Sequence, residues 1–287
     1  MNGWYESDGT RLGYRDTGSG LPVVFLHPTP LDRDYWRPMI EDLAGVRAIV
    51  PDFRGHGLSE LGSNLPVGGF ARAANAPVLT MAQLATDILA LLDHLEVREA
   101  FFAGCSVGGY VLLELWRRAP ERMQGLVFVC SKPQPDAEAN LAKRAANIER
   151  IYSEGTGGLF DGMAQTLIGA TAQERRPATA TELRAHMTLT AEAAVAVQAG
   201  LATRPDSIPT VAAIDVPVLA IAGGEDPGVT PEEMEAFKAV PGGCEFHLLP
   251  DAGHFAAYEQ PEKVAELLAE WLRRRPAVGE TAPAARQ

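Results

Sequence analysis

The feature that most constrains the fold of this chain is a regular alternation of short apolar segments with longer amphipathic ones. Helical spacing of apolar residues is clearest over residues 80–96, 107–119 and 264–272. Eight short segments have the character of β-strands: residues 4–6, 12–15, 22–27, 47–52, 100–104, 126–130, 217–222 and 244–249. This alternation predicts an α/β protein with a mostly parallel, eight-stranded sheet covered by helices on both faces.

Two long segments and the end of the chain interrupt the alternation. Residues 61–78 are rich in Gly, Ala and Asn and predict a surface loop. From about 131 to 213 the sequence shows only helical patterns, at 137–152 and 191–201. We expect residues 132–213 to form a helical lid over the carboxyl edge of the sheet. The last twelve residues, 276–287, are rich in Ala and Pro without periodicity, which predicts a disordered tail.

Charge and cysteine content exclude several classes of protein. The 287 residues carry a formal net charge of −12, which disfavours nucleic acid and anionic membranes as partners. The three cysteines are too scattered for a disulfide framework or a zinc cluster, and no dinucleotide-binding motif occurs, so we expect no metal and no cofactor. Neither a signal peptide nor an apolar run long enough to span a bilayer is apparent, which predicts a cytoplasmic protein. Nothing in the sequence separates a monomer from a homodimer.

One serine lies where a predicted strand joins a predicted helix. Residues 104–109 read Gly-Cys-Ser-Val-Gly-Gly, and the small residues on both sides of Ser106 permit a sharp turn that exposes its hydroxyl above the sheet. The backbone N–H of Val107 then lies at a helix N-terminus beside any oxyanion. The pattern predicts Ser106 as a nucleophile. Cys105 is expected to be a small buried residue rather than a catalytic thiol.

A serine nucleophile needs a base and an acid that orients the base. Among six histidines, His254 is distinct because it lies in the loop that leaves the last predicted strand. Such loops converge at the carboxyl edge of a parallel sheet, which favours His254 as the base. Residues 221–227, Ile-Ala-Gly-Gly-Glu-Asp-Pro, leave another strand at the same edge and offer Glu225 or Asp226 as the acid.

The loop after the third strand is the expected source of a second oxyanion donor. Residues 27–30 read His-Pro-Thr-Pro, and because proline has no N–H, Thr29 is the better donor. Residues 52–59, Asp-Phe-Arg-Gly-His-Gly-Leu-Ser, suit a tight turn in which Arg54 ties neighbouring loops together.

With these residues the chain resembles the α/β-hydrolase superfamily, over nearly its whole length apart from the tail. The matching blocks are residues 27–30, 52–59, 104–109, 223–231 and 251–261. The resemblance implies a core of residues 1–131 and 214–275 and favours Asp226 as the acid, since such proteins commonly show G-x-x-D followed shortly by Pro. Pro28 departs from the usual glycine after the histidine, which affects the conformation expected of the oxyanion loop.

Within the superfamily the chain resembles small carboxylesterases and 3-oxoadipate enol-lactonase-like members. Ser106, in place of the aspartate that epoxide hydrolases and haloalkane dehalogenases use, excludes their chemistry. The function expected is hydrolysis of a carboxylic ester or lactone of a small to medium, largely apolar substrate through an acyl-enzyme. The alternatives are C–C bond hydrolysis, acyl transfer, perhydrolysis, a lyase reaction, or ligand binding without catalysis.

The expected substrate-binding side chains lie mainly in the predicted lid. Trp36 fits the pocket or the core equally well. Lys143, Arg144 and Arg150 suit either a substrate carboxylate or a solvated helix face. The apolar candidates are Trp36, Tyr152, Leu159, Phe160, Met163, Met187 and Leu189.

Overall fold

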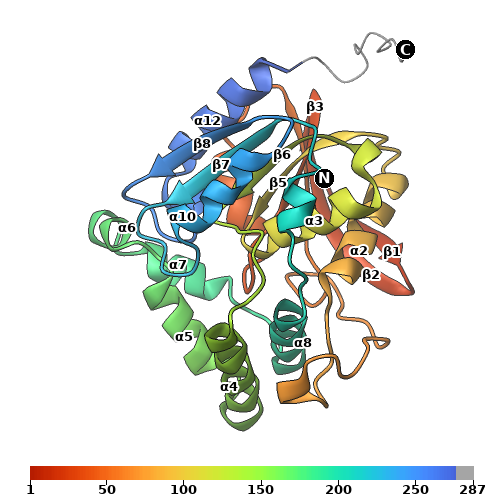
Figure 1. The fold of residues 1–287 in the computed structure, drawn as a ribbon, viewed down its shortest axis with the longest axis vertical. Helices are drawn as coiled ribbons and strands as arrows, with labels where there is room; N and C mark the ends of the chain where they lie inside the picture. Colours follow the sequence, from red (N-terminus) through yellow and green to blue (C-terminus); the bar gives the residue numbers. More distant parts are fainter. Residues whose placement is uncertain (276–287) are drawn as a thin grey trace.

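A twisted sheet of eight strands runs through the computed structural model, which describes residues 1–275 (Figure 1). Its strand order is β1-β2-β4-β3-β5-β6-β7-β8, and only the pairs β1–β2 and β2–β4 are antiparallel. The strands are β1 Asn2–Ser7, β2 Thr10–Gly18, β3 Leu21–Leu26, β4 Val46–Pro51, β5 Ala100–Cys105, β6 Met123–Val129, β7 Val218–Gly223 and β8 Cys244–Leu249. The predicted mostly parallel, eight-stranded sheet is confirmed.

Alternation of side chains along the central strands builds one apolar layer on each face of the sheet. Phe101 of β5 meets Trp271 of α12 (Pro261–Arg273), with ring centroids 5.7 Å apart. Phe128 of β6 pairs in register with Gly104, which points to the opposite face from Phe101 because it lies three positions further along β5. Phe128 therefore faces the other side of the sheet, where it stacks on Phe237 with ring centroids 4.1 Å apart. On the face of Phe101 lie α1 (Arg37–Ile40), α11 (Ala256–Glu259) and α12, and on the opposite face lie α2 (Met81–His94), α3 (Val107–Arg118) and α10 (Pro231–Met234).

Only helices and turns connect β6 to β7, a stretch that the structure describes completely. They are α4 Glu138–Glu154, α5 Gly157–Thr166, α6 Ala170–Arg175, α7 Thr179–Ala185, α8 Ala191–Ala202 and α9 Ile208–Val211. The helices predicted at 137–152 and 191–201 are therefore confirmed as α4 and α8. Figure 1 shows α4, α5 and α8 beyond one end of the sheet, and we call residues 132–213 the helical insertion.

The remaining expectations concern a loop and the end of the chain. Residues 61–78 contain one 3-10 turn, at Ala71–Ala73, and a single bridge between Val67 and Pro77, in agreement with the predicted loop. The predicted disordered tail, 276–287, lies outside the described residues. Within the described part of the chain, no helix combines the length and apolar character needed to cross a bilayer.

Candidate active site

Ser106 occupies the sharp turn between β5 and α3. Its backbone has φ 51° and ψ −113°, a conformation that side-chain-bearing residues rarely adopt and that is found at functional sites. The neighbouring glycines permit the turn: a Cβ on Gly108 would overlap the carbonyl oxygen of Leu26, and one on Gly109 would overlap the Ser131 hydroxyl. The small residues noted in the sequence are thus required by the close approach of α3 to β3 and to the end of β6.

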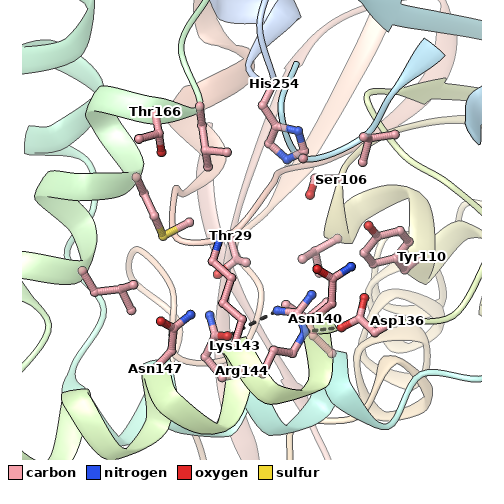
Figure 2. A pocket seen from close by; sticks show the side chains of 18 residues that line it. Thr29, Ser106, Tyr110, Asp136, Asn140, Lys143, Arg144, Asn147, Thr166 and His254 are labelled. Carbon is pink, nitrogen blue, oxygen red and sulfur yellow. Dashed lines mark hydrogen bonds and ion pairs between the residues drawn. The ribbon is translucent and has the colours of Figure 1, made fainter. Parts of the chain in front are cut away.

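His254 and Asp226 form a buried pair in loops that follow β8 and β7. His254 Nδ1 lies 2.8 Å from Asp226 Oδ2. The other carboxylate oxygen, Oδ1, accepts the N–H groups of Gly228 at 2.7 Å and Val229 at 3.1 Å. These contacts fix the carboxylate, which in turn fixes the tautomer and orientation of the imidazole. Figure 2 shows the His254 ring beside the hydroxyl of Ser106, and both residues line one cavity.

The electrostatic setting of His254 combines two opposed effects. Burial by itself lowers the pKa of the imidazole, because the cation loses its hydration. The negative charge of Asp226, the hydrogen bond to it and the negative charge of Glu259 together outweigh burial, so the pKa of His254 lies above its ordinary value.

Glu225, the other acid considered from the sequence, faces away from His254. Its carboxylate accepts the N–H of Thr171 at 2.9 Å and the hydroxyl of Thr171 at 2.5 Å. Glu225 therefore ties the loop after β7 to α6 of the helical insertion. Asp226 is the residue of this pair that contacts the imidazole.

The loop after β3 brings Thr29 to the same cavity. Thr29 and Val107 both line it, and neither backbone N–H donates a hydrogen bond to another of the described residues. The Thr29 hydroxyl lies 3.0 Å from His56 Nε2, and His27 Nε2 accepts the N–H of Phe53 at 3.0 Å. Burial lowers the pKa of His56 to about 4, so this ring is neutral near pH 7.

The segment 52–59 is tied to its surroundings through Arg54 and Asp52. Arg54 Nε donates to Asp87 Oδ2 at 2.6 Å, and its Nη2 donates to the carbonyl of Ser7 at 2.8 Å. Asp52 accepts the N–H of Arg33 at 2.9 Å and also pairs with the guanidinium of Arg33. Arg54 therefore ties this segment to α2 and to the end of β1, whereas the sequence suggested ties between neighbouring loops.

The cavity has a volume of about 220 Å³ and lies between the sheet edge and the helical insertion. Its lining mixes apolar side chains with amides, hydroxyls and charged groups, whereas the substrate-binding candidates chosen from the sequence were mainly apolar. The core contributes Thr29, Ser106, Val107, Tyr110, Gly228, Val229 and His254, and the insertion contributes Asp136, Asn140, Lys143, Arg144, Asn147, Leu159, Met163, Thr166, Leu167, Gln198 and Leu201.

The structure brings some of the expected substrate-binding residues to the cavity and leaves others outside it. Leu159 and Met163 line it, while Phe160 and Leu189 line a small hollow next to it. The remaining three, Trp36, Tyr152 and Met187, are absent from the lining that the described residues form.

Each of these three exclusions has a physical reason. Trp36 is fully buried in the core against Phe25, with ring centroids 5.4 Å apart. Met187 is buried away from the cavity, and Tyr152 is 63% exposed. Tyr152 lies nine positions after Lys143, and at about 100° per residue the two side chains point to opposite sides of α4.

Sequence reasoning found part of the polar side of the cavity, since Lys143 and Arg144 line it, and missed the amides beside them. Asn140 and Asn147 of α4 were not singled out, and Arg150 of the same helix lies outside the lining, paired with Glu154 at 3.0 Å. The available signal was the spacing of Asn140, Lys143, Arg144 and Asn147, which recur at intervals of three or four residues on a helix predicted to lie over the sheet.

The model of the alpha/beta hydrolase family matches residues 23–267. The chain belongs to the α/β-hydrolase family. The 3-oxoadipate enol-lactonase 1 of Acinetobacter baylyi is 25% identical over 265 residues, 88% of each protein. A non-heme chloroperoxidase of Streptomyces lividans is 38% identical over 132 residues, which are only 44% of this chain and 43% of that protein.

Among solved structures, a thermophilic esterase from Thermogutta terrifontis, with malate bound, superposes with a TM-score of 0.85. It is 32% identical to this α/β-hydrolase and the match covers 96% of this chain and 98% of the esterase.

Proposed function

We propose that the protein is a serine hydrolase that cleaves a carboxylic ester or lactone through an acyl-enzyme. The observation that carries the proposal is the buried pair of His254 and Asp226, 2.8 Å apart, beside a serine in a strained turn at the same cavity. The similarity to an esterase and to an enol-lactonase supports the same reaction class.

The reaction follows from the roles of these side chains. Ser106 Oγ attacks the carbonyl carbon while His254 accepts its proton, and Asp226 stabilises the resulting imidazolium. The N–H groups of Thr29 and Val107 donate to the oxyanion of the tetrahedral intermediate. His254 then protonates the leaving alcohol, which leaves the acyl group on Ser106. Water, deprotonated by His254, attacks the acyl-enzyme and releases the acid.

In this proposal residues 1–131 and 214–275 carry the catalytic groups, and the helical insertion determines which substrates fit the cavity. The cavity of about 220 Å³ suits a small or medium molecule. Leu159, Met163 and Leu201 offer an apolar wall to its hydrocarbon part.

The direct test compares hydrolysis of p-nitrophenyl esters of increasing acyl length by wild type and by Ser106→Ala. We expect the variant to lose at least about 10³-fold in kcat, because the acyl-enzyme cannot form. A fluorophosphonate should add one label to the wild type, on Ser106 by mass spectrometry. Ser153→Ala, a matched change on the outer surface of α4, should keep both turnover and labelling. Labelling elsewhere, or undiminished turnover in Ser106→Ala, would overturn the proposal.

A second candidate is perhydrolysis, in which hydrogen peroxide replaces water as the acceptor of the acyl group and a peracid leaves. The similarity to a non-heme chloroperoxidase favours testing it. The assay measures peracid against free acid when the ester substrate is turned over at increasing peroxide concentration. Peracid formation that disappears in Ser106→Ala would support this candidate.

A further inference from the structure

The polar wall of the cavity comes largely from one face of α4. Asn140, Lys143, Arg144 and Asn147 all line the cavity and follow one another at intervals of three, one and three residues. At about 100° per residue these positions share one side of the helix. Figure 2 shows them together across the cavity from Ser106 and His254.

Lys143 is distinguished among the lysines by having no anionic partner. The chain contains four lysines, all within the described residues, and three of them form ion pairs: Lys132, Lys238 and Lys263. In a protein of net charge −12, carboxylates are abundant, yet the Lys143 ammonium has none within salt-bridge distance among residues 1–275. An unpaired cation at a cavity wall is free to meet an anion from outside.

Among residues 1–275, Asp136 is the one carboxylate that lines the cavity, and it is already neutralised. Asp136 Oδ1 accepts from Arg204 Nη2 at 2.7 Å, and its Oδ2 pairs with Arg144. Burial alone would raise the pKa of Asp136, but the two guanidinium groups lower it below its ordinary value. Arg204 also lies over the ring of Tyr110, at 4.3 Å from its centroid. Arg144, Arg204 and Lys143 thus place three cations around the one carboxylate of Asp136.

The amides beside Lys143 add hydrogen-bond donors without adding negative charge. Asn140 and Asn147 lie one helical turn before and after Lys143 and line the same cavity. Arg144 is held by Asp136 and by Gln198, whose Oε1 accepts its Nη1 at 3.3 Å. The acidic residues at the two ends of α4, Glu138 and Glu154, pair with arginines and lie outside the lining.

We propose that this face of α4, centred on Lys143, binds a carboxylate of the substrate, so that the preferred ester or lactone carries a carboxylate away from the scissile carbonyl. The substrate's apolar segment would then span the cavity between the α4 face and Ser106. Preference among substrates rests on the proposed hydrolase function, whereas carboxylate binding by α4 does not.

Turnover tests the preference with two series of paired substrates. The first contains monomethyl esters of straight-chain dicarboxylic acids and the corresponding ester-amides, in which a neutral carboxamide replaces the carboxylate. The second contains O-acetyl hydroxy acids and their carboxamides, which place the carboxylate on the alcohol side. Acid release is followed by pH-stat for wild type, Lys143→Met and the control Lys263→Met, which removes an equal charge from the exposed side of α12.

For wild type we expect at least one carboxylate substrate to exceed its carboxamide about 10-fold or more in kcat/KM. Lys143→Met should lower kcat/KM for this carboxylate substrate 10- to 100-fold, mainly through a higher KM. For the corresponding carboxamide, kcat/KM should change by less than about 2-fold. Lys263→Met should change neither. Equal hydrolysis of both members of every pair, or an equal loss for both in Lys143→Met, would overturn the inference and leave the hydrolase function intact.

Binding tests the α4 site without any turnover. N-methyl monoamides of the same dicarboxylic acids resist ester cleavage, and calorimetry measures their dissociation constants with wild type, Lys143→Met and Lys263→Met. We expect binding by wild type and Lys263→Met and at least about 10-fold weaker binding by Lys143→Met. Absence of binding to folded wild type, or equal binding by all three proteins, would overturn the inference even if no ester were cleaved.

Discussion

The contact between Asp226 and His254 is the residue-scale interaction on which the proposed mechanism depends. Without Asp226 the buried imidazole would favour its neutral form strongly, since burial lowers its pKa. In the proposed mechanism, Asp226 at 2.8 Å stabilises the imidazolium that forms as Ser106 loses its proton. The proposed mechanism requires a neutral His254 in the free enzyme, so it predicts that kcat/KM rises with pH through the raised pKa of His254.

Asp226→Asn should therefore lower kcat about 10⁴-fold, because the imidazole loses its orientation and the imidazolium loses its counter-charge. The acid limb of residual kcat/KM should move to lower pH, since burial then lowers the pKa of His254 against only the weaker influence of the Glu259 carboxylate. Glu225→Gln is the matched control: it removes a neighbouring carboxylate that contacts Thr171, and the acid limb should stay in place. Stopped-flow pH–rate profiles of wild type and the two variants measure kcat and the position of the acid limb. A larger loss of kcat in Glu225→Gln than in Asp226→Asn would contradict the role given to Asp226.

At the scale of single residues, the sequence predicted poorly where side chains point. Ser106 and His254 could be singled out because a strand–turn–helix motif and a loop at the strand edge constrain where they lie. Glu225 and Asp226 are adjacent and chemically alike, and what separates them is a turn in which Asp226 accepts the N–H groups of Gly228 and Val229. Tyr152 was misplaced for a similar reason, because the rotation of α4 about its axis depends on tertiary contacts.

At the scale of elements, the loop that carries His254 is held by Glu259 at the end of α11. The Glu259 carboxylate accepts the N–H of Gly253 at 2.8 Å and that of Phe255 at 3.0 Å, on either side of His254. It also accepts the N–H of Gly169, at 3.0 Å, from the segment just before α6. One buried carboxylate thus joins the histidine loop to the helical insertion.

Glu259→Gln should destabilise the protein by about 1–3 kcal/mol, because the amide turns its NH₂ group toward at least one of these buried N–H donors. We also expect a loss in kcat, since the loop that positions His254 becomes less restrained. Denaturant unfolding and ester hydrolysis are measured beside Glu262→Gln, an exposed residue in the first turn of α12. If the two variants unfold and react alike, Glu259 has no such role.

Whole elements were predicted better than side chains, and their length explains why. The apolar runs of the central strands β3 to β7 and the long apolar stripes of α2 and α12 give a local signal that burial then satisfies. Short elements of the insertion, such as α6 and α7, have six and seven residues. They are too short to show a periodic face, and contacts such as that of Glu225 with Thr171 determine them.

Across the whole molecule, the insertion is joined to the core along α8 as well as through Glu225 and Glu259. This alanine-rich helix is buried along most of its length and packs on α4. Its Ala196 carbonyl accepts the N–H of Leu79, at 3.0 Å, from the segment that precedes α2. One turn on, Gly200 lies so close to Leu79 that a Cβ there would overlap the Leu79 carbonyl.

Two glycine-to-alanine changes in the insertion should therefore have opposite effects on stability. Gly200→Ala should destabilise the protein by about 1–3 kcal/mol, because α8 must move away from the backbone of Leu79. Gly162→Ala, within α5 where an added Cβ meets nothing within 4 Å, should stabilise it by about 0.5–1 kcal/mol through higher helix propensity. Denaturant unfolding measures both free energies.

The same displacement should reach the cavity, because α8 carries Gln198 and Leu201, which line it. We expect Gly200→Ala to raise KM for ester substrates and Gly162→Ala to leave KM unchanged. A destabilised Gly200→Ala with wild-type KM would mean that α8 can shift without deforming the cavity. A stabilised Gly200→Ala would contradict the close packing itself, and with it the view that the insertion is fixed on the core at this glycine.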